Sequence, residues 1–342
     1  MEAEKSKKKI LISGILFPAV AGAMLYLVFR AYDVRRVWRD AAGADGCCLL
    51  AGVAAMCSFV VCESVNIARL LRASGYRVGV RQMLTYGAAG FFFSGITPTA
   101  SGGQPMQLVY MARDGIRLSH GSLALLLELM SFQLANISLA LFGVACNLTA
   151  IAAMEPAAKT VIVVGISANA VVFCVLLLLV WNRRVSALAG KLIARVCRAL
   201  KKESAAEKVA GQLQEYRTGA VYIGEHMGIM LKNLVTSFAQ MTAEYSITYF
   251  VYRALGGVSY SWLTVVSLQA VLTAAIAVIP LPGGVGAGES GFKLMFASVF
   301  TGGLLMPGML LSRGISFYLG LLITGGFLLV VFLCGKAREY RR

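Results

Sequence analysis

The apolar sequence is interrupted at residues 95–105, which read GITPTASGGQP. A second interruption of similar chemistry lies at residues 280–289, which read PLPGGVGAGE, and the two stretches hold four of the seven prolines. Backbone of this kind leaves N–H and C=O groups unsatisfied, so it is tolerated at membrane depth only inside protein or beside water. Two short apolar segments broken by Gly and Pro, one in each half of a chain, are typical of a transporter binding site.

The composition indicates an integral membrane protein. Of the 342 residues, 58% are hydrophobic and 14% are charged, whereas about a quarter of the residues in soluble domains are charged. The net charge of +16 would also fit a nucleic-acid-binding protein, but the 32 Lys and Arg residues do not gather on a soluble basic face. The eight cysteines lie mostly in apolar runs without C-x-x-C spacing, which is typical of small buried side chains. We expect no nucleic acid partner, no metal and no cofactor.

Six stretches are apolar over the roughly 20 residues that a spanning helix needs, namely 10–29, 47–67, 118–146, 157–181, 229–252 and 308–335. The first is too long for a signal peptide and has no small-residue cleavage site after it. Residues 83–116 contain the first interruption, and the apolar run of about 14 residues before it predicts a re-entrant hairpin. Residues 262–302 contain the second, with arms of about 18 residues, which fits either two spans or a second hairpin. We therefore expect an all-α polytopic protein with six to eight transmembrane helices and one or two re-entrant hairpins.

The distribution of basic residues predicts the orientation in the membrane. With the N-terminus inside, 23 of the Lys and Arg residues fall on the cytoplasmic side, 6 fall outside and 3 lie within apolar runs. Both termini are therefore expected in the cytoplasm, and the membrane is expected to be a bacterial cytoplasmic membrane. The first hairpin then opens to the cytoplasm and the second outward, as in two inverted, pseudo-symmetric halves at residues 1–181 and 228–342.

Residues 182–227 form the long soluble segment that joins the two halves. Val185, Leu188 and Leu192 recur at helical spacing beside basic residues, which predicts an amphipathic helix on anionic inner-leaflet lipid. Its basic residues are Arg183, Arg184, Lys191, Arg195 and Arg198. The alternative is a positive-inside topology anchor that selects no lipid. Residues 283–290 have the spacing of a phosphate-binding loop, but Glu289 stands where its lysine must be, which argues against ATP hydrolysis.

Carboxylates inside apolar segments mark candidate sites, because a charge there is costly unless it is paired or hydrated. Glu128 and Glu244 lie near the middle of their segments. Glu63 lies near the end of its segment, where it could also snorkel to the interface. Glu289 and Lys293 are four residues apart, a spacing that also fits a structural ion pair on one helix.

Arg313 is the one permanent charge deep in the last apolar segment, and no acid lies within one turn of it. A guanidinium there needs an anionic partner. That partner is either a carboxylate from another helix or a lipid phosphate, which Arg binds in a bidentate manner.

Polar residues follow the first interruption at a spacing of three, as on one face of a short helix. They are Gln104, Gln107, Tyr110 and Arg113. Free N–H groups at the start of this helix, near Ser101, Gly102 and Gly103, would favour a phosphate. The alternative is that these polar groups only satisfy the broken backbone.

Three motifs carry a resemblance to a known family: residues 97–107 (TPTASGGQPMQ), residues 282–289 (PGGVGAGE) and residues 313–318 (RGISFY). Together they resemble the lysylphosphatidylglycerol synthase transmembrane-region family, the flippase-like membrane domain of the bacterial multiple peptide resistance factor, MprF. The similarity covers nearly the whole chain and implies translocation of aminoacylated or glycosylated phospholipid. The motif residues that the resemblance assigns to this chain are Thr97, Pro98, Gly102, Gly103, Gln104, Pro105, Gly283, Gly284, Glu289 and Arg313. The third motif also includes Tyr318.

The chain departs from the family pattern in two respects. Relatives often carry Arg directly after the carboxylate at Glu128, whereas Leu129 follows here. The soluble aminoacyl-transferase domain of full-length MprF is missing, so we expect no synthase activity and a separate lipid-modifying synthase as a possible partner.

The expected function is a lipid flippase that passes a phospholipid headgroup through a polar cavity while the acyl chains stay in lipid. One alternative is a membrane-embedded lipid-phosphate or polyprenyl-phosphate enzyme. Such chemistry usually needs a dense cluster of acid, Ser, His and Arg, and the first interruption holds no acid or Arg. Another alternative is a small-solute secondary transporter, which would enclose its substrate.

Overall fold

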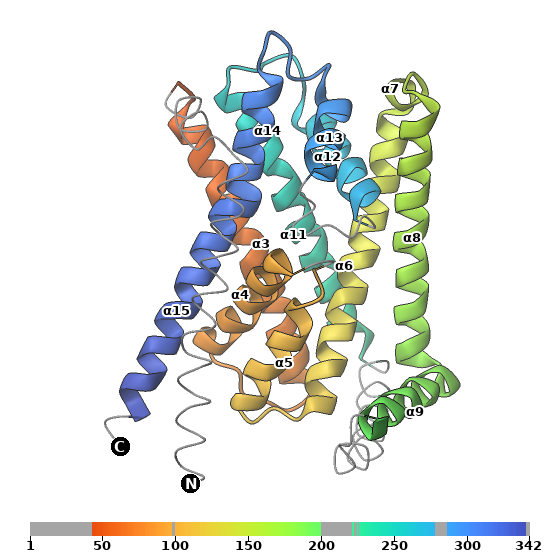
Figure 1. The fold of residues 1–342 in the computed structure, drawn as a ribbon, viewed down its shortest axis with the longest axis vertical. Helices are drawn as coiled ribbons and strands as arrows, with labels where there is room; N and C mark the ends of the chain where they lie inside the picture. The colour runs from red at the N-terminus through yellow and green to blue at the C-terminus, as the bar shows by residue number, and fades with distance from the viewer. Residues whose placement is uncertain are drawn as a thin grey trace. The chain divides into compact units, whose positions relative to one another are not determined.

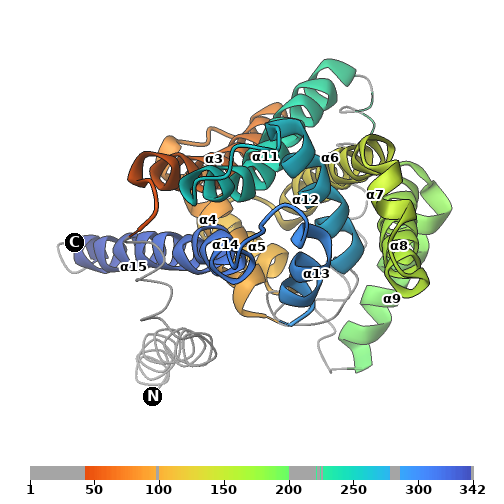
Figure 2. The same ribbon diagram turned by 90° about the horizontal axis from the view of Figure 1, so that it is seen from above.

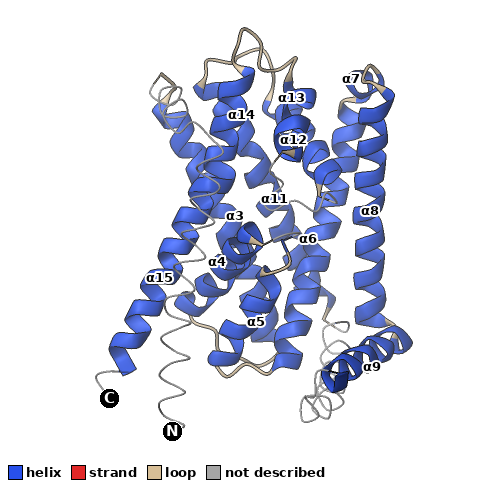
Figure 3. Ribbon diagram, viewed as in Figure 1, coloured by secondary structure: helices blue, strands red, loops and turns tan. Residues whose placement is uncertain are grey.

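The computed structural model describes residues 43–97, 100–199, 221, 224, 226–277 and 286–339. The chain divides into two compact units, Met1–Ala44 and Asp45–Arg342, and the second contains all the helices labelled in Figure 1. Within the described residues all regular secondary structure is helical, and Figure 3 shows no strand among them. The first predicted span, residues 10–29, lies outside the described residues.

Four described helical segments are long and apolar enough to cross a membrane: α3 (Gly46–Ala73), α6 (Leu118–Cys146), α8 (Pro156–Trp181) and the continuous segment Leu305–Cys334. They confirm as helices the predicted spans at 47–67, 118–146, 157–181 and 308–335. The outer surface of α8 is apolar, with Val163, Val164 and Val171 exposed. A soluble protein rarely exposes such a continuous apolar face, so this surface suits lipid.

Helix α11 (Met227–Ala254) covers the predicted span at 229–252 but is more polar than those four. Its polar residues recur every three or four positions, so they form one stripe on the helix. The stripe comprises Asn233, Ser237, Gln240, Glu244 and Thr248, and all but Glu244 are buried. Among the described helices, α11 packs most extensively against α3. The polar stripe therefore lies inside the protein. It lowers the mean hydropathy of α11, although the helix is long enough to span a membrane.

Two pairs of short helices pack as hairpins. Helix α4 (Val80–Ile96) packs on α5 (Gly103–Arg113), and α12 (Trp262–Ile276) packs on α13 (Ala287–Phe296). All four are shorter than the roughly 20 residues needed to cross a bilayer. The α4–α5 hairpin lies in the lower half of Figure 1 and the α12–α13 hairpin in the upper half.

Each hairpin packs against a long helix from the other half of the chain. Helix α4 contacts α15 (Gly320–Glu339), whereas α12 contacts α6 and α8. Seen from above, α8 and α15 lie on opposite sides of the unit, with α12 and α13 between them (Figure 2). The remaining described helices are the short α7 (Leu148–Ala152) and α9 (Arg183–Ala199), which follows α8 at the lower end of the view in Figure 1.

Local signals in the sequence explain several helix ends. The Asp45 carboxylate accepts from the N–H groups of Cys47 and Cys48 at the start of α3, and Ser261 caps α12 by accepting from Thr264 N–H. Pro156 opens α8, where its missing N–H has no cost. Helices α3 and α5 are followed by Gly75 and Gly115, both at positive φ, a conformation that favours glycine.

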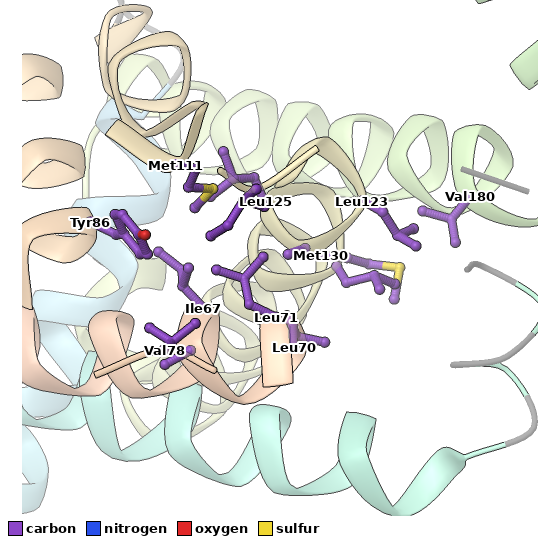
Figure 4. Packing of buried hydrophobic residues seen from close by; sticks show 14 of the residues in the cluster. Ile67, Leu70, Leu71, Val78, Tyr86, Met111, Leu123, Leu125, Met130 and Val180 are labelled. Atoms are coloured by element: carbon purple, nitrogen blue, oxygen red, sulfur yellow. The ribbon is translucent and has the colours of Figure 1, made fainter. Parts of the chain in front are cut away.

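A cluster of buried hydrophobic side chains fixes the α4–α5 hairpin in place (Figure 4). Ile67 and Leu71 from α3 pack with Tyr86 from α4, Met111 from α5 and Leu123 from α6. Because all four helices contribute, the hairpin cannot shift without opening this core.

Helix α14 (Leu305–Arg313) continues into a π-helical turn, η3 (Gly314–Leu319), before α15 begins. Such turns carry a residue more per turn than an α-helix and are frequent at functional sites. Arg313 is the last residue before the turn.

Candidate functional site

Arg313 forms an ion pair with a carboxylate from another helix. Its Nε is 3.6 Å from Oε1 of Glu289 on α13, and the side chains are 18% and 11% exposed. Its charge also interacts with Glu244 on α11. The guanidinium lies over the ring of Phe317, 5.2 Å from the ring centroid, a favourable cation–π arrangement. The structure thus shows the protein-carboxylate alternative for Arg313, with Glu289 as the partner.

Glu289 faces α14 and not Lys293. Its carboxylate also accepts from Gly286 N–H at the start of α13, and Gly286 has φ +88°. Lys293 is exposed, and the predicted Glu289–Lys293 ion pair is wrong because the stronger partner comes from α14. A Cβ at Gly288 would lie 3.3 Å from the Arg313 guanidinium carbon, so glycine there permits close approach. Gly283 and Gly284 lie outside the described residues.

Glu63 points into the α4–α5 hairpin. Gln107 Nε2 donates to Glu63 Oε1 at 2.9 Å and to the Tyr86 carbonyl at 3.1 Å. Since two acceptors use both N–H bonds, the orientation of the amide is fixed. A Cβ at Gly90 would lie 2.2 Å from Gln107 Nε2 and 2.4 Å from Glu63 Oε1, so only glycine leaves room for the pair. The predicted alternative in which Glu63 snorkels to the interface is therefore wrong.

Glu128 lies on α6 with 7% of its surface exposed. Helix α6 packs against α3, the helix that carries Glu63. The described residues place no Lys or Arg in ion-pair contact with either carboxylate.

The amides that follow Glu128 on α6 belong to a separate buried network. Tyr245 Oη donates to Asn136 Oδ1 at 2.7 Å, and the amides of Asn136 and Gln133 approach Asn169 Oδ1 at 3.4 and 3.3 Å. Asn169 Nδ2 donates to the Ala274 carbonyl at 3.1 Å. The network links α6, α8, α11 and α12. The sequence analysis missed Asn169. A lone amide in the very apolar α8 could have been singled out for the same reason as the charged residues, because a polar side chain inside the membrane is costly.

The turn between α4 and α5 satisfies part of its own backbone. Thr97 Oγ1 donates to the Phe93 carbonyl at 2.6 Å and accepts from Gly102 N–H at 2.8 Å. A Cβ at Gly103 would lie 2.1 Å from Ser94 Oγ, so glycine allows close packing, and neither Gly102 nor Gly103 has positive φ. The predicted alternative, that polar groups only satisfy the broken backbone, describes Thr97. Pro98 lies outside the described residues, and Ser101 is exposed.

The polar face predicted after the first interruption is confirmed as a helix but divides into two parts. Gln107 is buried against Glu63, and Gln104 and Tyr110 are half-buried. Arg113 is exposed at the end of α5, where its guanidinium lies over the Tyr110 ring at 5.5 Å. Only Gln107 therefore joins the buried carboxylates.

Two buried polar side chains near Arg313 and Glu244 make no hydrogen bond within the described part of the chain. The Gln240 amide is unpaired at both Nε2 and Oε1, one turn before Glu244 on α11, and Ser312 Oγ is unpaired beside Arg313. Unsatisfied buried groups are rare and call for an explanation such as an absent ligand or water. Tyr318 is buried on η3 in the same region.

The family described as "Lysylphosphatidylglycerol synthase TM region" matches residues 10–324. A UPF0104 membrane protein of Pyrococcus horikoshii is 24% identical over 291 residues, which cover 81% of this chain and 85% of that protein. The chain therefore belongs to the lysylphosphatidylglycerol synthase transmembrane-region family, in agreement with the resemblance carried by its three motifs.

Proposed function

We propose that this membrane protein is a lipid translocase, which moves the headgroup of an amino-acid- or sugar-modified phospholipid between leaflets. The observation that carries the proposal is the set of ionisable side chains inside a helical unit with an apolar outer surface. Glu63, Glu128, Glu244, Glu289 and Arg313 come from five different segments, and the Gln240 amide and the Ser312 hydroxyl, near Glu244 and Arg313, make no hydrogen bond within the described residues. Burying these ionisable groups costs free energy, and a polar lipid headgroup is a substrate that they can bind.

In this mechanism the headgroup crosses beside the polar stripe of α11 while the acyl chains stay in lipid. The lipid phosphate competes with Glu289 and Glu244 for Arg313, whose planar guanidinium suits phosphate. The unpaired amide of Gln240 offers both a donor and an acceptor to the headgroup. No bond in the lipid is broken, so the protein acts as a transporter and not as an enzyme.

The two helical hairpins are arranged as an alternating-access transporter requires. They lie toward opposite ends of the unit (Figure 1), and each packs on a long helix of the other half. This reciprocal packing supports two inverted halves, of which one can rock against the other around a central site.

The orientation follows from the loops at one end of the unit. Helix α9, the α5–α6 connection and the end of α15 lie at the lower end in Figure 1, and the sequence concentrates Lys and Arg there. We place this end in the cytoplasm of a bacterial cell. On α9, Leu188 and Leu192 are 68% and 60% exposed, beside the exposed Lys191 and Arg195, which suits an anionic lipid surface. Arg183 and Arg184 open the same helix, and the Arg198 side chain lies outside the described residues.

Reconstitution into liposomes with fluorescent lipids of several headgroups tests the proposal. We expect wild-type protein to expose lipid from the inner leaflet to an impermeant quencher, with a rate that depends on the headgroup. Glu244→Gln should lose most of this transfer, whereas the control Glu155→Gln removes an exposed acid before α8 and should keep it.

Other results would favour other functions. Release of phosphate or a changed lipid product would indicate an enzyme. Uptake of a soluble solute without lipid movement would indicate a solute transporter. Folded wild-type protein that moves none of the lipids would refute the proposal.

A further inference from the structure

Arg69 joins α3 to α11 through uncharged partners. Its Nη1 donates to Asn66 Oδ1 at 2.9 Å and to Asn233 Oδ1 at 2.7 Å, and its Nη2 donates to Thr236 Oγ1 at 3.1 Å. These four side chains form the Arg69 cluster. A guanidinium has five N–H groups and a permanent positive charge. The three acceptors therefore use part of its hydrogen-bonding capacity and neutralise none of its charge.

No carboxylate within the described part of the chain forms an ion pair with Arg69. Glu63, six residues earlier on α3, accepts from Gln107 of α5 at 2.9 Å. Asp114, which follows α5, accepts from Tyr86 Oη at 2.6 Å. Both acids are therefore held by uncharged donors from other segments, and the positive charge of Arg69 is left without an anion from the described helices.

The neighbouring exposed side chains are also basic. Lys232 directly precedes Asn233 on α11, and Arg72 follows Arg69 after about one turn of α3. Arg72 donates to the Val78 carbonyl at 2.7 Å, which is again an uncharged acceptor. Three cations therefore lie at this end of the α3–α11 contact, where their charges favour an anionic ligand.

Asn233 holds a buried donor that no described group accepts. Its side chain is fully buried, and Nδ2 makes no hydrogen bond within the described residues. Arginine can only donate, so the bond from Arg69 turns Oδ1 of this amide toward the guanidinium and leaves Nδ2 as the unpaired end. Asn66 contacts the same guanidinium, but its Nδ2 donates to Ser237 Oγ at 3.0 Å. Because buried unsatisfied donors are rare, the unpaired Nδ2 indicates a site for an acceptor.

The Arg69 cluster lies at the level expected for lipid headgroups. The apolar stretch 47–67 ends two residues before Arg69, and α3 ends four residues after it. Helix α11 begins six residues before Asn233. At 1.5 Å per residue, both side chains lie within about 10 Å of their helix ends. Glu244 is eleven residues further along α11, or about 16 Å, so the cluster is separate from the site around Arg313.

We propose that Arg69 and Asn233 form a binding site for a phosphate group at the membrane surface. Any acceptor of Asn233 Nδ2 lies within a few ångströms of the guanidinium, because Oδ1 of the same amide is 2.7 Å from Nη1. Arg69 is partly exposed, so a ligand can reach it. A water molecule would satisfy the amide alone, whereas a phosphate oxygen also supplies the missing negative charge and suits the guanidinium.

A phospholipid headgroup and free inorganic phosphate both offer this chemistry. The site concerns binding, and it does not depend on whether the protein transports lipid. Thermal unfolding of the full-length protein in an uncharged detergent measures the binding, because a ligand of the folded state raises the melting temperature. The probes are dihexanoyl phosphatidylglycerol and, separately, inorganic phosphate, both at matched ionic strength.

For wild type we expect a rise of about 5 °C when a probe is present at about a hundred times its Kd. A rise with the lipid alone supports a phospholipid site, and a rise with inorganic phosphate as well supports a site for phosphate from either source. No rise with either probe would leave the Arg69 cluster as a structural contact between two helices and would overturn the proposal.

Two variants and a control locate the binding. Arg69→Gln removes the charge and should abolish the rise, although it also loses hydrogen bonds between α3 and α11. Asn233→Asp has nearly the same shape, keeps an acceptor for Arg69 and supplies the negative charge from the protein. It should fold and no longer respond to either probe. The control Arg72→Gln removes a cation from the same end of α3 and should respond like wild type.

Two results with these variants would overturn the site. A rise that persists in Asn233→Asp would show that the probe does not bind at the Arg69 cluster. A rise that falls in Arg72→Gln as much as in Arg69→Gln would show only that anions gather at a positively charged surface.

Discussion

Replacing Arg313 with Gln removes the cation that pairs with Glu289. The Arg313 and Glu289 side chains are 18% and 11% exposed, so the pair is largely buried, and removing one partner of such a pair costs about 3 to 5 kcal/mol. The distance of 3.6 Å between Nε and Oε1 exceeds that of a charge-assisted hydrogen bond. Glu289 also keeps its hydrogen bond from Gly286. We therefore expect the lower end of the range, a loss of about 3 kcal/mol in the free energy of unfolding.

Unfolding in detergent of wild type, Arg313→Gln, Glu289→Gln and the double variant measures this loss. The double variant should be more stable than Arg313→Gln, because it no longer strands the acid, with a coupling energy of about 1 to 3 kcal/mol. The reasoning fails if Arg313→Gln unfolds like wild type, or if the two losses simply add. Lipid transfer by the double variant separates the two roles of Arg313. Lost transfer in a stable protein supports contact with the phosphate, whereas restored transfer leaves only the structural pair.

Three further predictions follow from the positions of single residues. In a cysteine-free background, a cysteine at Arg184 should be shielded from an impermeant thiol reagent in intact cells, whereas a cysteine at Glu155 should react, because the two positions lie at opposite ends of α8. Labelling at Arg184 from outside the cell would contradict the orientation. Gly103→Val should stop lipid transfer, since even a Cβ at this position would lie 2.1 Å from Ser94 Oγ. The control Gly326→Ala, whose Cβ meets nothing within 4 Å, should transfer lipid and unfold like wild type. Wild-type lipid transfer by Gly103→Val would show that the close approach is dispensable. Asn169→Leu should lower the free energy of unfolding by about 1 to 3 kcal/mol by stranding its buried partners, and an unchanged unfolding midpoint would show that the network adds no stability.

The sequence predicted the long helices well because a membrane span has to be apolar over its whole length. Helix α6 runs from Leu118 to Cys146, the boundaries expected from hydropathy alone. The length of the apolar arm after the second interruption does not give the length of the helix in it, because an apolar run need not be helical throughout. Helix α13 ends at Phe296, and the chain then turns through Gly302 and Gly303 at positive φ, while Phe300 packs back on Phe296 and Gly308.

The sequence identified the charged residues of the candidate site and, as one alternative, the pairing of Arg313 with a carboxylate from another helix, but it did not identify which carboxylate. Glu63, Glu128, Glu244, Glu289 and Arg313 were all identified because charge is rare in apolar segments. Spacing along one helix suggested Lys293 as the partner of Glu289, whereas the actual partner comes from α14. Contacts between distant segments depend on how helices pack, and a single sequence does not record that packing.

The π-helical turn after Arg313 makes the length of that segment important to within one residue. In an α-helix each residue turns the chain by about 100°, so deleting one residue of Gly314–Leu319 to restore regular winding would rotate α14 by that angle relative to α15. Arg313 would then swing away from Glu289, although both helices kept their composition and hydropathy. A surface loop would tolerate the deletion of one residue, whereas here the deletion changes the direction in which the Arg313 side chain points. The winding of this one turn therefore decides which carboxylate Arg313 can reach.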